Sequence, residues 1–177
     1  DTLPGLYVHD AMVDVVNATG SRRSIKISEF ICAPGKINLA PGELAAGVTV
    51  RGLGPLEGSA FRRFTQRYAL DLALASVAAR VRFESDQQTV AQASIALGAV
   101  GPTVLDAGQA AALLVGRTLE PAQLRECANL AAECCQPITD HRASADYRRQ
   151  LVRALTEEVV LAAAKQVTAG CSPVETS

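Results

Sequence analysis

Hydrophobic and polar residues alternate most regularly between residues 76 and 84. Four apolar side chains fall on one face of this segment and small or charged ones on the other: Val77, Ala79, Val81 and Phe83 against Ala78, Arg80, Arg82 and Glu84. A period of two residues predicts a half-buried β-strand. Residues 85–88 have the composition of a turn, and residues 93–99 alternate again. We therefore expect residues 59–101 to form an antiparallel meander.

The pattern changes to a helical period between residues 103 and 167. Asp106 and Gln109 have the spacing of a capping box at the start of a helix, and Gly116 is a suitable C-terminal stop for that helix. Pro121 suits the first turn of a second helix. A third helix is expected from about Ser144, with an apolar face formed by Tyr147, Leu151, Ala154, Leu155, Val159 and Ala162. Its polar face would carry Arg148, Arg149, Arg153, Glu157 and Glu158.

The first fifty residues predict three short strands, at residues 12–16, 25–27 and 48–50, with turn sequences between them. Few large apolar side chains are present, so these strands bury little surface by themselves. They form either a hairpin-rich subdomain or a sheet that a partner or another segment completes.

Glycine and proline in RGLGPLEG mark a boundary between two units. We place a linker at residues 53–58, between an N-terminal unit of residues 1–52 and a domain of residues 59–167, followed by a flexible tail at residues 168–177. Three strands followed by three helices is an α+β order. The second domain is therefore predicted to be a three-stranded antiparallel sheet with a layer of three helices over one face.

Composition narrows the classes of function. Apolar residues make up 49% of the chain, which suits a packed globule, and the net charge of −1 argues against a general nucleic-acid or membrane-surface binder. No uncharged run reaches the roughly 18 residues of a membrane-spanning helix. The first ten residues lack the basic and apolar segments of a signal peptide.

The five cysteines predict a structural role. They are irregularly spaced, without a C-x-x-C pair: Cys32, Cys127, Cys134, Cys135 and Cys171. Cys127, Cys134 and Cys135 lie in the segment with a helical period and are expected to act as small buried hydrophobic residues, and none of the five is expected to be a metal ligand. Without a secretory signal, a reducing cytoplasm is the expected location.

Catalytic motifs are nearly absent. His9 and His141 have no metal-ligand partners at useful spacing, and no GxGxxG, P-loop or GxSxG pattern occurs. The remaining candidate is a basic cluster, Arg62, Arg63 and Arg67, in the segment FRRFTQRYALDLALAS. It is either a solvated strand face or a contact to an anion or cofactor, for which arginine offers several donors.

Four ordered segments carry a family resemblance: PGKINLAPGELAAGVTV, GSAFRRFTQRYALDLALASVAARV, ASIALGAVGPTVLDAGQAAALLVGR and PITDHRASADYRRQLVRALTEEVV. Together they resemble the FAD-binding medium subunit of the molybdenum hydroxylases, the family of xanthine dehydrogenase and carbon monoxide dehydrogenase. The resemblance covers residues 1 to about 166. It implies that residues 59–167 are the family's C-terminal flavoprotein domain and that residues 1–52 end an α+β FAD-binding subdomain. The family's two glycine-rich segments, which hold the FAD diphosphate, do not occur in this sequence, so the chain resembles the C-terminal portion of such a subunit.

The resemblance implies three cofactor contacts. Asp1 matches an aspartate that hydrogen-bonds FAD near the ribityl chain and ring. Ala45 matches a position whose main chain faces the isoalloxazine. Arg63 replaces a lysine that contacts the flavin, and its positive charge would stabilise the anionic reduced form. Residues 67–71 match a loop beside the ring, where Asp71 either tunes the flavin potential or holds the loop.

The implied function is electron transfer in an oxidoreductase subunit that is not active alone. Electrons would pass from iron–sulfur clusters through FAD to NAD or another acceptor. The implied cofactors are FAD, shared with the N-terminal part of the flavin subunit, and molybdopterin and 2Fe-2S clusters in a molybdopterin subunit and an iron–sulfur subunit. No catalytic or metal-ligating residue is expected in this chain. The alternative is a non-catalytic flavin-domain remnant that serves as an assembly or interaction module.

Overall fold

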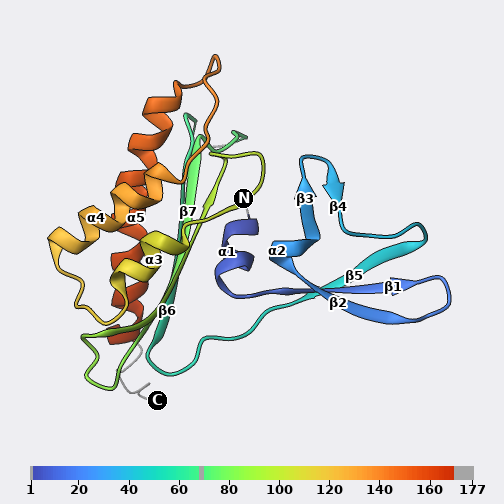
Figure 1. Cartoon of the computed structure of the whole chain (residues 1–177), viewed down its shortest axis with the longest axis horizontal. Coiled ribbons are helices and arrows are strands. Elements are labelled where there is room, and N and C mark those ends of the chain that lie inside the picture. The colour runs from blue at the N-terminus through green and yellow to red at the C-terminus, as the bar shows by residue number, and fades with distance from the viewer. Residues whose placement is uncertain (1, 68–69, 170–177) are drawn as a thin grey trace, which may run out of the picture.

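The C-terminal part of the chain is an antiparallel sheet with helices over one face (Figure 1). The computed structural model describes residues 2–67 and 70–169. The sheet has the order β6-β7-β8-β9, with strands β6 (Glu57–Phe64), β7 (Ala75–Phe83), β8 (Val90–Gly98) and β9 (Leu105–Asp106). The helices are α3 (Gly108–Leu114), α4 (Pro121–Glu133) and α5 (Ala145–Ala169). The α+β fold expected from the sequence is confirmed.

The main core lies between this sheet and the helices. Val77 pairs with Leu97 and Ala79 pairs with Ile95 across β7 and β8, and all four side chains are fully buried. Each large aliphatic side chain removed from water in this way contributes about 1.5–3 kcal/mol. The alternating face predicted for residues 76–84 is therefore the face that packs under the helices.

The sequence predicted a sheet of three strands, and the structure adds a fourth strand of two residues, β9. In β9, Asp106 pairs with Ala96 and Leu105 pairs with Leu97. The capping-box prediction for Asp106 is wrong, because this residue belongs to β9 and α3 begins after Ala107 without a side-chain cap. Pro121 does occupy the first turn of α4, as predicted.

The buried face of helix α5 differs from the apolar face that the sequence predicted. Its buried apolar side chains are Val152, Leu155, Val159, Val160, Ala163 and Val167, whereas the predicted core residue Ala154 is exposed. Arg148, predicted on the polar face, is only 3% exposed. The physical reason is that Nη1 and Nη2 of its guanidinium donate to the carbonyl oxygen of Leu74 and to Oδ1 of Asp140 in place of water, while its buried Nε has no partner among the described residues.

The N-terminal part begins with an unpredicted helix, α1 (Leu3–Val8), and contains a sheet of order β2-β1-β5. Its elements are β1 (Met12–Asn17), β2 (Arg22–Lys26), α2 (Ile27–Phe30), β3 (Ile31–Ala33), β4 (Lys36–Ile37) and β5 (Glu43–Thr49). Its small core consists of Ala11, Val13, Val15, Ile25 and Ile27. The three predicted strands exist, except that Ile27 starts α2 and the third strand ends at Thr49.

Helix α1 joins the two parts of the molecule (Figure 1). Val8 packs with Ala78 and Ala96 on the face of the C-terminal sheet opposite the three helices. Gly98 allows this close approach, because a Cβ at that position would lie 2.8 Å from the Cγ of Pro4 and 2.5 Å from the Oγ of Ser76. The strand face that carries Ala78 is thus covered by α1 over part of its length.

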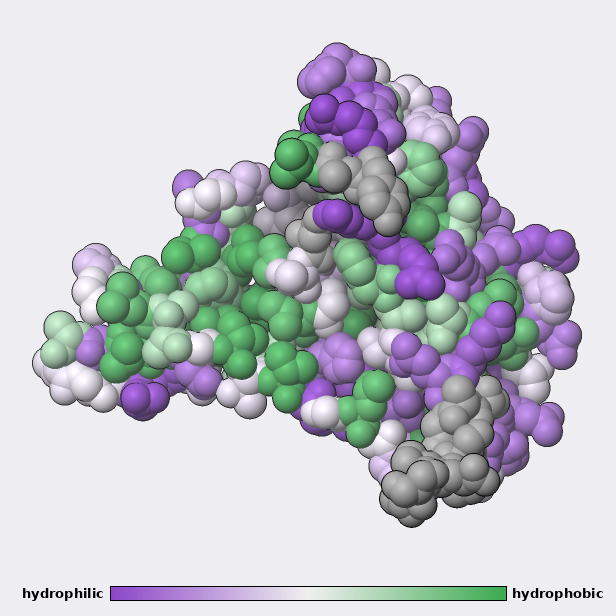
Figure 2. Space-filling view, turned by 180° about the vertical axis from the view of Figure 1, so that it is seen from behind, coloured by the Kyte–Doolittle hydropathy of each residue, from purple (hydrophilic) through white to green (hydrophobic). Residues whose placement is uncertain are grey.

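Strand β5 is exposed along most of its length. The N-terminal part and the following loop expose five large apolar side chains: Ile37, Leu44, Val48, Val50 and Leu53. Figure 2 shows apolar side chains gathered over this part on the rear face of the molecule. Among residues 2–67 and 70–169, no helix combines the length and apolar character needed to cross a membrane.

Candidate functional site

A shallow depression of about 350 Å³ lies where α1, the segment after β5 and strand β6 meet. It is lined by Thr2, Gly5, Leu6, His9, Val50, Phe61 and Arg63. The polar side chains in this lining are those of Thr2, His9 and Arg63. The depression therefore offers an apolar surface with one permanent positive charge beside it.

The alternation of β6 decides which arginine reaches this depression. Phe61 and Arg63 are two residues apart and lie on the α1 face of the strand, whereas Arg62 points the other way. The Nε of Arg62 donates to Oε1 of Glu158 on α5 at 2.8 Å, in an exposed ion pair. The basic cluster seen in the sequence is thus divided between two faces of the sheet.

The third arginine of the cluster, Arg67, is bonded to Asp71. Both carboxylate oxygens of Asp71 accept backbone hydrogen bonds, from the N–H of Arg67 and the N–H of Leu72, each at 2.9 Å. The bond from Arg67 is the largest cause of the lowered pKa of Asp71. This geometry suits the loop-holding alternative for Asp71.

The three residues implied by the resemblance are placed differently. Arg63 lines the depression, and Asp1 lies outside the described residues, although its neighbour Thr2 lines the depression. Ala45 is exposed in the middle of β5, opposite Val15, and does not line this depression. The structure therefore brings Arg63 next to Thr2, whereas Ala45 lies outside this depression.

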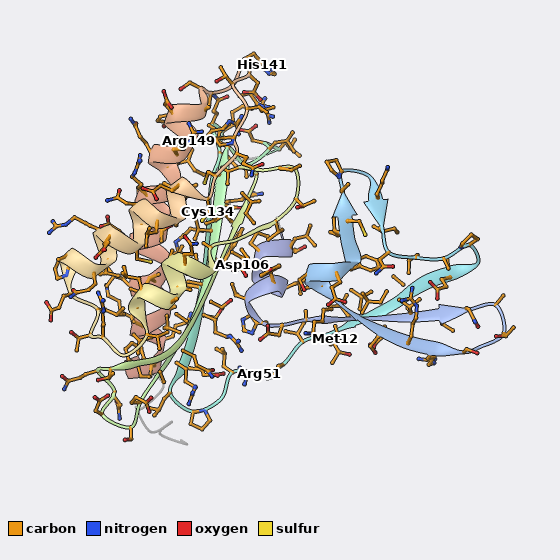
Figure 3. The ribbon with its side chains drawn as sticks, in the orientation of Figure 1. Met12, Arg51, Asp106, Cys134, His141 and Arg149 are labelled. Atoms are coloured by element: carbon orange, nitrogen blue, oxygen red, sulfur yellow. The ribbon has the colours of Figure 1, made fainter. Side chains whose placement is uncertain are left out.

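His9, which the sequence analysis set aside for lack of partners at useful spacing, lines the depression. Its Nε2 lies 2.9 Å from the Oγ of Ser59, and its buried Nδ1 has no hydrogen-bond partner among the described residues. Nothing in the sequence predicted α1, so nothing indicated that its C-cap would reach β6. His141 lies instead in the exposed loop between α4 and α5 (Figure 3).

A second cavity, of about 590 Å³, lies beside the first turn of α1 and the loops at one end of the sheet. Leu72, Ser76, Asp140, Arg142 and Arg148 are among its lining residues. Burial opposes ionisation of Asp140, but hydrogen bonds from the backbone of Ala143 and Arg142 and from both guanidinium groups outweigh it and hold its pKa well below the usual range. The carboxylate is therefore ionised and fixed in place.

The cysteines of the described part are free thiols. Burial raises the pKa of Cys127 to about 12, and burial followed by the charge of Cys134 raises that of Cys135 to about 11. Among residues 2–67 and 70–169, no group of three His, Cys, Asp or Glu side chains is placed to hold a metal ion. Cys171 lies outside the described residues.

Comparison with known proteins identifies the family. Residues 59–163 match the CO dehydrogenase flavoprotein C-terminal domain. The chain belongs to this flavoprotein family, which confirms the resemblance seen in the sequence.

Three known proteins show how far the similarity extends. The chain is 28% identical over 155 residues to the 6-hydroxypseudooxynicotine dehydrogenase complex subunit alpha of Paenarthrobacter nicotinovorans, covering 88% of this chain and 51% of that protein. It is 28% identical to the glyceraldehyde dehydrogenase medium chain of Sulfolobus acidocaldarius, covering 83% of this chain and 50% of that protein. A solved structure of carbon monoxide dehydrogenase from Hydrogenophaga pseudoflava superimposes with a TM-score of 0.86 at 25% identity, over 97% of this chain and 57% of that one. The chain thus spans about half the length of each of these three proteins.

Proposed function

We propose that this chain forms the ring-side part of an FAD-binding subunit that transfers electrons within a molybdenum hydroxylase complex. The observation that carries the proposal is the family match over residues 59–163, in the same domain whose β6 brings Arg63 to an apolar depression beside α1. FAD, when bound, supplies the capacity to take up and release electrons one or two at a time.

The residues around the depression suit a planar, mostly apolar ring with a polar edge. Leu6, Val50 and Phe61 provide apolar surface, which excludes water from one side of such a ring. The guanidinium of Arg63 would face a carbonyl or an anionic edge of the ring. Asp1 and the main chain of Ala45 are the further contacts that we propose for the ribityl chain and the ring.

The exposed face of the N-terminal part indicates where another segment of the flavin subunit would pack. Leu44 and Val48 are 70% and 49% exposed on β5, which is an edge strand of its sheet. Such an apolar edge suits completion by another segment. We assign that role to the N-terminal part of the flavin subunit, which would also hold the FAD diphosphate.

An iron–sulfur subunit would deliver electrons and a molybdopterin subunit would oxidise the substrate, with NAD or another acceptor receiving the electrons. The names of two relatives, a complex subunit and a medium chain, support assembly with other chains. The cytoplasmic location stays a prediction.

The test is FAD binding by this chain co-expressed with the rest of its flavin subunit. The complex should carry FAD close to one per chain, with a visible flavin spectrum. Arg63→Gln should weaken FAD binding about tenfold, the typical loss of one charge-assisted contact, whereas the neighbouring control Arg62→Gln should not. A well-folded complex without flavin would reject the proposal and favour the assembly-module alternative.

A further inference from the structure

The first turn of α5 holds the end of the strand that carries Arg63. The Nη1 of Arg148 donates to the carbonyl oxygen of Leu74 at 2.8 Å. The N–H of Leu74 in turn donates to the carbonyl oxygen of Phe64 at 2.8 Å. Because Phe64 directly follows Arg63, two hydrogen bonds connect a guanidinium that is 3% exposed to the backbone beside Arg63.

A second contact from the same turn reaches the side chain of Phe64. The rings of Tyr147 and Phe64 meet edge to face, with centroids 6.3 Å apart and an interplanar angle of 83°. This is a favourable arrangement for two aromatic rings. Consecutive residues of α5 therefore hold both the side chain and, through Leu74, the backbone of Phe64.

The Arg148 guanidinium is itself oriented by Asp140. Its Nη2 donates to Oδ1 of Asp140 at 3.0 Å, and the same carboxylate oxygen accepts from the N–H groups of Arg142 and Ala143 at 3.0 and 3.1 Å. The Nε2 of Gln66 donates to the carbonyl oxygen of Arg142 at 2.6 Å. The segment around Asp140 thus supports the β6–β7 connection at both of its ends.

We propose that Arg148, oriented by Asp140 and assisted by Tyr147, is a positioning residue for Arg63 in the candidate flavin site. The proposal rests on the proposed function for the identity of the bound group. A buried guanidinium with fixed acceptors loses little freedom when it holds a backbone carbonyl, so it keeps the end of β6 in one place. Arg63 is exposed, and its backbone belongs to that strand end, next to Phe64.

The first measurement needs no flavin. It compares Arg148→Met with Arg149→Met, a matched control in which the neighbouring arginine (labelled in Figure 3) pairs with the exposed carboxylate of Asp146. The amide of Leu74 should exchange with solvent about tenfold faster in Arg148→Met and at the original rate in the control. An unchanged rate at Leu74 in a folded Arg148→Met protein overturns the proposal.

Two further variants keep the test decisive if Arg148→Met does not fold. Arg148→Lys retains a positive charge beside Asp140 but lacks the two-armed guanidinium, so the Leu74 amide should still exchange faster. Tyr147→Leu removes the ring contact at a residue that is 41% exposed and leaves the hydrogen bonds in place. It should raise the exchange rates of the Phe64 and Leu74 amides by a smaller factor. Unchanged exchange rates in both variants contradict the proposal.

The second measurement is FAD titration of the chain co-expressed with the rest of its flavin subunit. Arg148→Met should weaken FAD binding about tenfold when Arg63 is present and have no further effect in an Arg63→Gln background. Losses that simply add in the double variant overturn the proposal, because Arg148 would then act independently of Arg63. If the unmodified complex binds no FAD, the proposed function fails, whereas the exchange rate of Leu74 still decides whether Arg148 holds the strand end.

Discussion

Gly58 of β6 lies directly against Ala163 of α5. A Cβ atom at position 58 would stand 1.9 Å from the carbonyl oxygen of Ala163 and 2.9 Å from its carbonyl carbon. Both of these atoms are backbone, so neither can rotate out of the way. Strand and helix can come this close because residue 58 has no side chain.

Gly58→Ala should therefore lower the free energy of unfolding by about 3 kcal/mol, because the helix must shift away from the sheet. Urea denaturation checks the value. Gly52→Ala is the matched control, since no atom lies within 4 Å of a Cβ built there. Equal midpoints for the two variants would show that α5 is not seated against Gly58.

Leu97→Ala should cost about 2–5 kcal/mol of stability, because it leaves a cavity in the core between the sheet and the helices. Leu97 is fully buried and pairs with Val77 across the strands. Leu161→Ala on α5 is the comparison, because Leu161 is 39% exposed and its loss should be much smaller. A loss for Leu97→Ala no larger than that for Leu161→Ala would contradict the position of the core.

Acid should weaken the N-terminal sheet through Glu43. Hydrogen bonds from the Arg23 guanidinium, at 2.7 and 2.8 Å, and then from the N–H of Ala40 lower the pKa of Glu43 from 4.5 to about 2. A carboxylate with a lowered folded-state pKa contributes stability that is present above about pH 4.5 and is lost as the pH falls toward about 2.

The pKa of Glu43 can be followed by NMR titration of its side chain. Glu43→Gln should remove this part of the pH dependence, so its stability should change less than that of the unmodified protein between pH 4.5 and 2. A normal titration near pH 4.5 would show that the Arg23 contact does not persist in solution.

The thiols should differ widely in reactivity. Cys32 is exposed, whereas Cys127 and Cys135 are buried and their raised pKa values leave almost no thiolate near neutral pH. Alkylation mapped by mass spectrometry should modify Cys32 in the native protein and the two buried cysteines after denaturation. Cys32→Ser should abolish the early modification at that peptide; rapid native labelling of Cys127 would contradict the packing of α4.

The sequence by itself determined the family and the main strands and helices after residue 59, apart from the short strand β9. Strand β7 was predictable because alternation is a local property: Val77 and Val81 face the core whatever element covers them. Pro121 likewise marked the first turn of α4 through its own geometry. The quoted segments around β6 and α5 were enough to place the chain among the flavoprotein domains, which the family match confirms.

The tertiary structure alone decided which polar groups come together. Arg148 looked like a surface residue because periodicity cannot show that Leu74 and Asp140, 74 and 8 positions away, supply acceptors inside the fold. The position of His9 beside Ser59 depends on α1 packing on the sheet, a contact across 50 residues that no local pattern encodes. Side-chain periodicity reports which face of an element is apolar, whereas the burial of a charge depends on partners that only the folded chain brings within hydrogen-bond distance.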